Sequence, residues 1–95
     1  SMTDYLSSVV DKVSRLWPDL TFKPDAPPSA TLYRGIADST QHAVVAQYGQ
    51  ILHVRVYDPA RVEQVQQVLR ELGLEPRVKD QLDDFGKIDI DALLN

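Results

Sequence analysis

The sequence predicts a small α+β domain, in which an antiparallel sheet is covered on one face by two amphipathic helices. Two segments carry nonpolar residues at helical spacing. The stretch from His42 to Tyr57, HAVVAQYGQILHVRVY, has the composition of two strands joined at a glycine. A chain of 95 residues has the length of one domain. The expected order of elements is α-β-β-β-α-β, with a short helix following near the C-terminus.

The first expected element is an amphipathic helix from Thr3 to Trp17, with Thr3 or Asp4 as its cap. Its nonpolar stripe consists of Leu6, Val9, Val13 and Leu16, widened by Tyr5, Val10 and Trp17. Pro18 ends the helix, because proline disfavours the helical conformation in the residue before it. We expect Trp17 to pack into the core at the end of this helix.

A connector and a first strand come next. Residues 19–29 contain three prolines, and within them Leu20 and Phe22 could form a short edge strand before Pro24. A strand is expected over residues 30–36. Gly35 lies inside it and indicates a bulge or a close approach of another backbone.

The central hairpin follows a polar turn over residues 37–41 and is the anchor of the predicted sheet. Gly49-Gln50 is its turn, because glycine supplies the positive φ required at the first central position. This turn pairs Tyr48 with Ile51, Ala46 with His53, Val44 with Arg55, and His42 with Tyr57. Side chains alternate across a strand, so the two faces separate. The core face is expected to carry Ala43, Val45, Leu52, Val54 and Val56. The other face is expected to carry His42, Val44, Tyr48, Ile51, His53, Arg55 and Tyr57.

The second helix is predicted from Pro59 to Leu72. Asp58 is a favoured N-cap, proline is tolerated at the first helical position, and Gly73 stands where a C-cap glycine belongs. The nonpolar stripe consists of Val62, Val65, Val68, Leu69 and Leu72. This narrow stripe predicts a helix that lies on the sheet.

The C-terminal part is expected to contain a short edge strand and a tail. The strand covers residues 74–79 and is weakened by Pro76, which cannot donate a backbone hydrogen bond. Residues 80–95 form an acidic-hydrophobic tail, in which we expect a short helix from about Asp89. This tail could cover the second face of the hairpin or leave it open to a partner.

Composition limits the classes of function. The net charge of −4 and the pI near 4.9 argue against nucleic acid or an anionic membrane as the main partner. The absence of cysteine removes disulfides, a thiolate nucleophile and cysteine metal sites, and suits a cytoplasmic protein. No apolar run approaches the roughly 20 residues of a membrane helix. Residues 1–2 are interpreted as a cloning scar, and the chain as a single domain.

Catalytic and metal-binding constellations are weak in this sequence, so no cofactor and no enzymatic activity are predicted. His42 and His53 lie on one predicted face but lack the further ligands that zinc requires. A calcium loop aligned on Gly86 fails at three ligand positions. The serines lack a glycine-flanked elbow, and the glycines are too scattered to cradle a phosphate. A small hydrolase is the alternative if a pocket holds a histidine beside a carboxylate.

The leading hypothesis is therefore a non-enzymatic protein-interaction module, either an inhibitor, an immunity-type protein, an adaptor or a chaperone. Its predicted binding surface is the polar-aromatic face of the hairpin, represented by His42, Tyr48, His53, Arg55 and Tyr57. Tyrosine and arginine are enriched among the residues that anchor interfaces. The hypothesis also allows for a homodimer. The alternative is a small-ligand or nucleic-acid-binding module that uses this sheet face.

The element order and acidity resemble those of the small acidic chaperones of bacterial secretion systems. The size and charge are also similar to those of immunity proteins. These resemblances imply dimerisation and retention of an effector in the first case, and neutralisation of a toxin in the second. The order helix, three strands, helix is also that of a double-stranded-RNA-binding domain. That domain would need a basic start to the second helix, whereas this helix begins with Asp58, Arg61 and Glu63.

Overall fold

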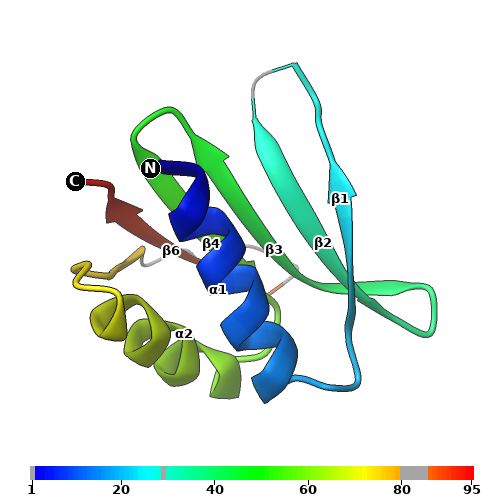
Figure 1. Cartoon of the computed structure of the whole chain (residues 1–95). Coiled ribbons are helices and arrows are strands. Elements are labelled where there is room, and N and C mark those ends of the chain that lie inside the picture. Colours follow the sequence, from blue (N-terminus) through cyan, green and yellow to red (C-terminus); the bar gives the residue numbers. More distant parts are fainter. Residues whose placement is uncertain (1, 29, 80–85) are drawn as a thin grey trace.

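A computed structural model of the chain describes residues 2–28, 30–79 and 86–95 (Figure 1). The elements are α1 (Met2–Leu16), β1 (Thr21–Asp25), β2 (Thr31–Ala37), β3 (Thr40–Tyr48), β4 (Ile51–Val56), α2 (Ala60–Glu71), β5 (Arg77–Lys79) and β6 (Ile88–Leu93). The structure confirms the predicted mixed α+β class with an antiparallel sheet. Residues 80–85 of the predicted tail lie outside the described residues.

The sheet has six strands in the order β1-β2-β3-β4-β6-β5, and every neighbouring pair is antiparallel. β6 lies between β4 and β5, so these two strands run parallel to each other and are connected through α2. The short helix expected from Asp89 is wrong, because this residue lies in β6. Isoleucine and aspartate alternate there with the period of a strand, and this period prevails over the capping preference of aspartate.

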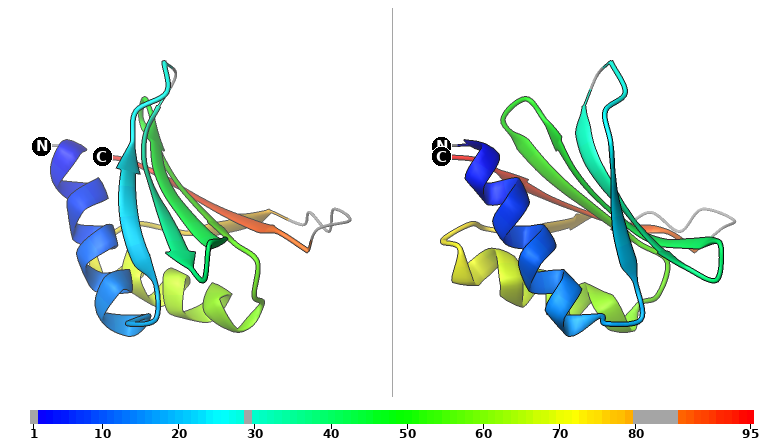
Figure 2. Two further views of the ribbon diagram at one scale, coloured as in Figure 1. Left: turned by 90° about the vertical axis from the view of Figure 1, so that its right-hand side faces the viewer. Right: turned by 45° about the vertical axis from the view of Figure 1, so that its right-hand side comes forward.

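The two helices cover one face of the sheet, as predicted, so the fold has one layer of helices and one layer of strands (Figure 2). α1 packs over β1 and β3, α2 packs over β4 and β6, and the helices also contact each other. The main core between the layers includes Val9 and Val13 from α1, and Val65 and Leu69 from α2, all fully buried. Leu16 is a correction to the predicted stripe, because α1 ends at this residue and leaves it 46% exposed.

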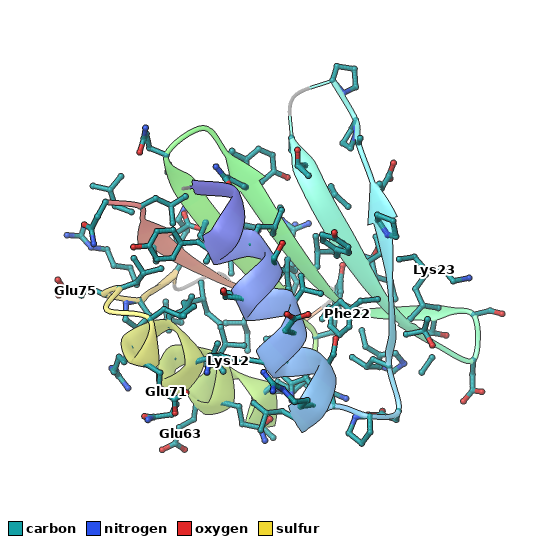
Figure 3. The ribbon with its side chains drawn as sticks, in the orientation of Figure 1. Lys12, Phe22, Lys23, Glu63, Glu71 and Glu75 are labelled. Atoms are coloured by element: carbon teal, nitrogen blue, oxygen red, sulfur yellow. The ribbon has the colours of Figure 1, made fainter. Side chains whose placement is uncertain are left out.

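Trp17 connects the end of α1 to the start of α2 and is buried, as predicted. Its indole Nε1 donates a hydrogen bond of 2.7 Å to Gln64 Oε1. The Arg61 guanidinium stacks 4.6 Å from the ring centroid, and its Nη2 lies 3.6 Å from Asp19 Oδ2. A second bridge between the helices joins Lys12 Nζ to Glu71 Oε2 at 3.5 Å (Figure 3).

The hairpin formed by β3 and β4 has the predicted register. Tyr48 pairs with Ile51, Ala46 with His53, and Val44 with Arg55. Gly49 has a φ of 56°, as a tight turn with glycine at its first central position requires. The predicted core-face residues are all completely buried: Ala43, Val45, Leu52, Val54 and Val56.

A bulge between β2 and β3 changes the position of one predicted residue. Gly35 pairs with Ala43 and Ile36 pairs with Gln41, so His42 is the extra residue of β3. The β3–β4 ladder therefore ends at the pair of Ala43 with Val56, and the predicted pairing of His42 with Tyr57 is absent from it. The bulge was predicted at Gly35 of β2. In the structure its extra residue is His42, in the opposite strand β3.

Gly35 is required by the packing of Phe22, its partner across the β1–β2 pair. A Cβ atom at Gly35 would lie 2.9 Å from two atoms of the Phe22 ring. The ring covers the glycine and packs against the main core on the side of α1 (Figure 3). The predicted close approach of another backbone at this glycine is wrong, because the atoms that come close are those of an aromatic side chain from the neighbouring strand.

Both ends of α2 have the predicted caps. Asp58 Oδ1 accepts a hydrogen bond of 3.0 Å from the Ala60 N–H. At the other end Gly73, with a φ of 79°, donates to the Arg70 carbonyl, and the Leu74 N–H donates to the Leu69 carbonyl. These two bonds form a Schellman motif, which directs the chain from α2 towards β5.

Candidate functional site

The candidate site lies on the outer face, which we define as the face of the sheet opposite the helices. Cross-strand register arranges its side chains in rows that run from β3 across β4 and β6 to β5. One row contains Val44, Arg55, Asp89 and Lys79, and the next contains Ala46, His53, Asp91 and Arg77. Val44 and Ala46 are buried and form a small nonpolar cluster with Leu32.

Arg55 and Asp89 form the best-defined ion pair of the outer face. Arg55 Nε donates to Asp89 Oδ1 at 2.8 Å, and Arg55 Nη2 donates to Asp89 Oδ2 at 3.3 Å. Two parallel hydrogen bonds fix the guanidinium in one plane against the carboxylate. Asp89 is only 6% exposed, so this carboxylate depends on its partner for compensation of its charge.

His53 lies between two carboxylates of β6. Its Nδ1 is 2.6 Å from Asp91 Oδ1, and its Nε2 is 3.5 Å from Asp89 Oδ1. Asp91 also accepts a contact of 2.8 Å from Lys79 Nζ, and the Tyr48 ring meets the imidazole edge-on at 5.9 Å. His53, Arg55, Lys79, Asp89 and Asp91 thus form one charged cluster, drawn from three strands.

The carboxylates of the charged cluster are held in their ionised form. Burial disfavours ionisation of Asp89 and is the largest single influence, but the hydrogen bond and charge of Arg55, helped by the charge of His53, outweigh it and lower its pKa. Burial likewise opposes ionisation of Asp91, whereas hydrogen bonds from Lys79 and His53 lower its pKa. The hydrogen bond to Asp89 raises the pKa of Arg55.

A nonpolar row borders the charged cluster at the hairpin end of the outer face. Tyr48 of β3 pairs with Ile51 of β4, which pairs with Leu93 of β6. These neighbouring side chains are 42%, 41% and 69% exposed. We call Tyr48, Ile51 and Leu93 the apolar row.

The five predicted site residues fall into three places. His53 and Arg55 lie in the charged cluster, and Tyr48 lies in the apolar row beside it. Tyr57 accepts a hydrogen bond of 3.1 Å at its hydroxyl from Gln41 Nε2, and Gln41 Oε1 accepts one of 2.8 Å from Arg34. His42 is half-buried at the bulge, and Gln41, instead of His42, contacts Tyr57.

Sequence reasoning missed the members of the site that come from β5 and β6. Asp89 and Asp91 supply the anions, Lys79 a cation, and Leu93 the most exposed nonpolar side chain of the row. The alternation of the segment Ile88–Leu93 was the available signal, because it places both aspartates on one face of a strand. A groove of about 750 Å³ adjoins these residues, between the end of β6 and the loop from α2 to β5.

The described residues contain no group of three or more histidine, aspartate or glutamate side chains that could hold a metal ion. Neither helix in this part of the chain is long and apolar enough to cross a membrane. The outer face combines the charged cluster with the exposed side chains of the apolar row. Comparisons of the chain with protein-family models, curated proteins and solved structures give no significant match.

Proposed function

We propose that this chain is a non-enzymatic protein-interaction module that binds a partner protein through the outer face of its sheet. The apolar row carries the proposal. Scattered nonpolar residues are normal on a protein surface, but Tyr48, Ile51 and Leu93 are adjacent and come from three different strands. Covering them with a partner would remove nonpolar surface from water.

The charged cluster supports the proposal by the order that it imposes beside the apolar row. Arg55, His53 and Lys79 are each held by a carboxylate of β6, so little side-chain freedom remains to be lost on binding. A nonpolar centre with a polar rim is the usual composition of an interface. Tyrosine and arginine, both present here, are enriched among the residues that anchor such contacts.

The environment of His53 favours a structural role over proton transfer. Both ring nitrogens face carboxylates of the protein itself, at 2.6 Å and 3.5 Å. A general base must be within hydrogen-bond reach of the proton that it abstracts from a substrate. The proposal includes a cytoplasmic location, which the cysteine-free composition supports.

The test compares two variants with matched exposure in a pull-down from lysate of the source organism, read by mass spectrometry. Ile51→Ser alters the apolar row, and Leu16→Ser alters a side chain of similar exposure on the helical side. We expect a partner that is retained by the wild type and Leu16→Ser and is lost from Ile51→Ser. Light scattering on the same three proteins shows whether the partner is a second copy of the chain. Equal retention by all three proteins would overturn the proposal.

A further inference from the structure

The sheet has a gap at one edge, next to the apolar row. A binding site at this gap rests on the proposed function, because it would hold part of the same partner protein. β5 pairs with β6 only from Asp89 to Asp91. β6 continues through Ala92 and Leu93, which pair with β4 on their other side. Pro76 immediately precedes β5, and no residue before Arg77 pairs with β6. The edge of β6 at Leu93 is therefore without a neighbouring strand within the described part of the chain.

The register shows which backbone groups face this gap. The Leu94 N–H donates to the Gln50 carbonyl at 2.7 Å, so the backbone of Leu94 points towards the hairpin. Successive residues of an antiparallel strand direct their N–H and C=O groups to opposite sides. The N–H and C=O of Leu93 consequently point into the gap. Among residues 2–28, 30–79 and 86–95, they have no backbone partner there.

The groove beside this gap has room for a further segment of chain. Its volume is about 750 Å³, and its lining includes the exposed side chains of Ile51 and Leu93. Arg77 also lines it, is exposed, and forms no ion pair with the described residues. The Lys79 charge is already met by Asp91. Glu75 also lines the groove, and its side chain extends outward from the body of the molecule (Figure 3).

We propose that this groove binds an extended segment of the partner protein, which adds to the sheet at the edge of β6. The backbone of the segment pairs with the N–H and C=O of Leu93. One nonpolar side chain of the segment packs on Leu93 and Ile51, and an acidic side chain meets Arg77. Main-chain pairing at a sheet edge supplies affinity, and the flanking side chains supply specificity.

The selection experiment uses a random heptapeptide library displayed on phage, with the full chain as target and Arg77→Glu as counter-target. We expect enrichment of peptides in which a nonpolar residue has an acidic residue close to it. Titration of such a synthetic peptide into the ¹⁵N-labelled chain should shift the amide signal of Leu93. Absence of enrichment, or signal changes that avoid Leu93 and Arg77, would overturn the inference.

Two substitutions at Leu93 separate its backbone from its side chain. Both Leu93→Ala and Leu93→Pro shorten the side chain, but only the proline removes the N–H. Because this N–H faces away from β4, its loss leaves the β4–β6 ladder intact. We expect Leu93→Pro to bind the selected peptide about fivefold more weakly than Leu93→Ala, the effect of one hydrogen bond. Equal affinities would refute main-chain pairing.

Arg77 provides a second test that does not depend on tolerance of proline. Arg77→Glu should weaken the acidic peptide about tenfold or more, and replacing the acidic residue of the peptide by lysine should restore binding to this variant. An unchanged affinity would refute the role of Arg77. If the natural partner is lost from Ile51→Ser but binds Arg77→Glu and Leu93→Pro normally, the groove inference fails and the proposed function stands. If the natural partner binds all three variants normally, both the groove inference and the proposed function are refuted.

Discussion

The Arg55–Asp89 pair gives the sharpest prediction about stability. Asp89→Asn keeps the shape of the side chain and removes the charge that compensates Arg55. Losing one partner costs about 3–5 kcal/mol in a fully buried pair and about 0–1 kcal/mol in an exposed pair. The Asp89 side chain is 8% exposed and that of Arg55 is 32% exposed, so we expect an intermediate loss of about 2 kcal/mol.

Urea unfolding at pH 7 measures this loss, and thermal unfolding should show a fall in Tm of about 10 °C. Asp25→Asn is the matched control, because Asp25 pairs with Arg34 on the same face at 3.2 Å while both side chains are largely exposed. We expect its cost to be below about 1 kcal/mol. Equal costs for the two variants would refute the argument that burial sets the strength of these pairs.

Acid titration tests the same pair in a second way. The folded pKa of Asp89 is below its ordinary value, so its ionisation stabilises the fold at pH values above the unfolded pKa of about 3.9. This contribution is lost as the pH falls through the folded pKa. The difference in unfolding free energy between the wild type and Asp89→Asn should therefore shrink below about pH 4. A difference that stays constant down to pH 2 would show that its origin is not the charge.

Three further substitutions test the backbone features, each by urea unfolding. Gly35→Ala should lower the free energy of unfolding by about 1–3 kcal/mol, because the new methyl group would meet the Phe22 ring. Adding Phe22→Leu should recover part of this loss. An unchanged stability of Gly35→Ala would contradict the close contact between Gly35 and Phe22. Gly73→Ala should cost about 1 kcal/mol, because its φ of 79° is strained for a residue with a Cβ atom. Asp58→Ala should cost about 1 kcal/mol through loss of the N-cap, and no change would show that Pro59 alone starts α2.

Local patterns were sufficient for the hairpin and for α2. The turn at Gly49 fixes the register of β3 and β4, and alternation then determines the core face. The caps Asp58 and Gly73 fix the limits of α2 to within one residue at each end. These features depend on residues close together in the sequence, and for this reason they could be derived without the structure.

Local sequence patterns could not predict which strands pair when they are far apart in the chain. The alternation in Ile88–Leu93 is compatible with a strand, but nothing near it indicates insertion between β4 and β5. The charged cluster depends on this insertion, because it brings Asp89 beside Arg55 and Asp91 beside His53. The bulge at His42 lies in the β2–β3 hairpin, whose tight turn at Asp38-Ser39 has positive φ at two residues that are not glycine.

The interior place of β6 has a consequence for the order of folding. The pairs from Ile51–Leu93 to Val56–Ile88 close a loop that contains the whole of α2, so they are entropically the most expensive contacts of the sheet. Until they form, β4 is an edge strand with unpaired backbone groups, and its nonpolar residues are open to strands of other molecules. A nascent chain is therefore most prone to aggregation in the interval after β4 is synthesised and before β6 is available to pair with it.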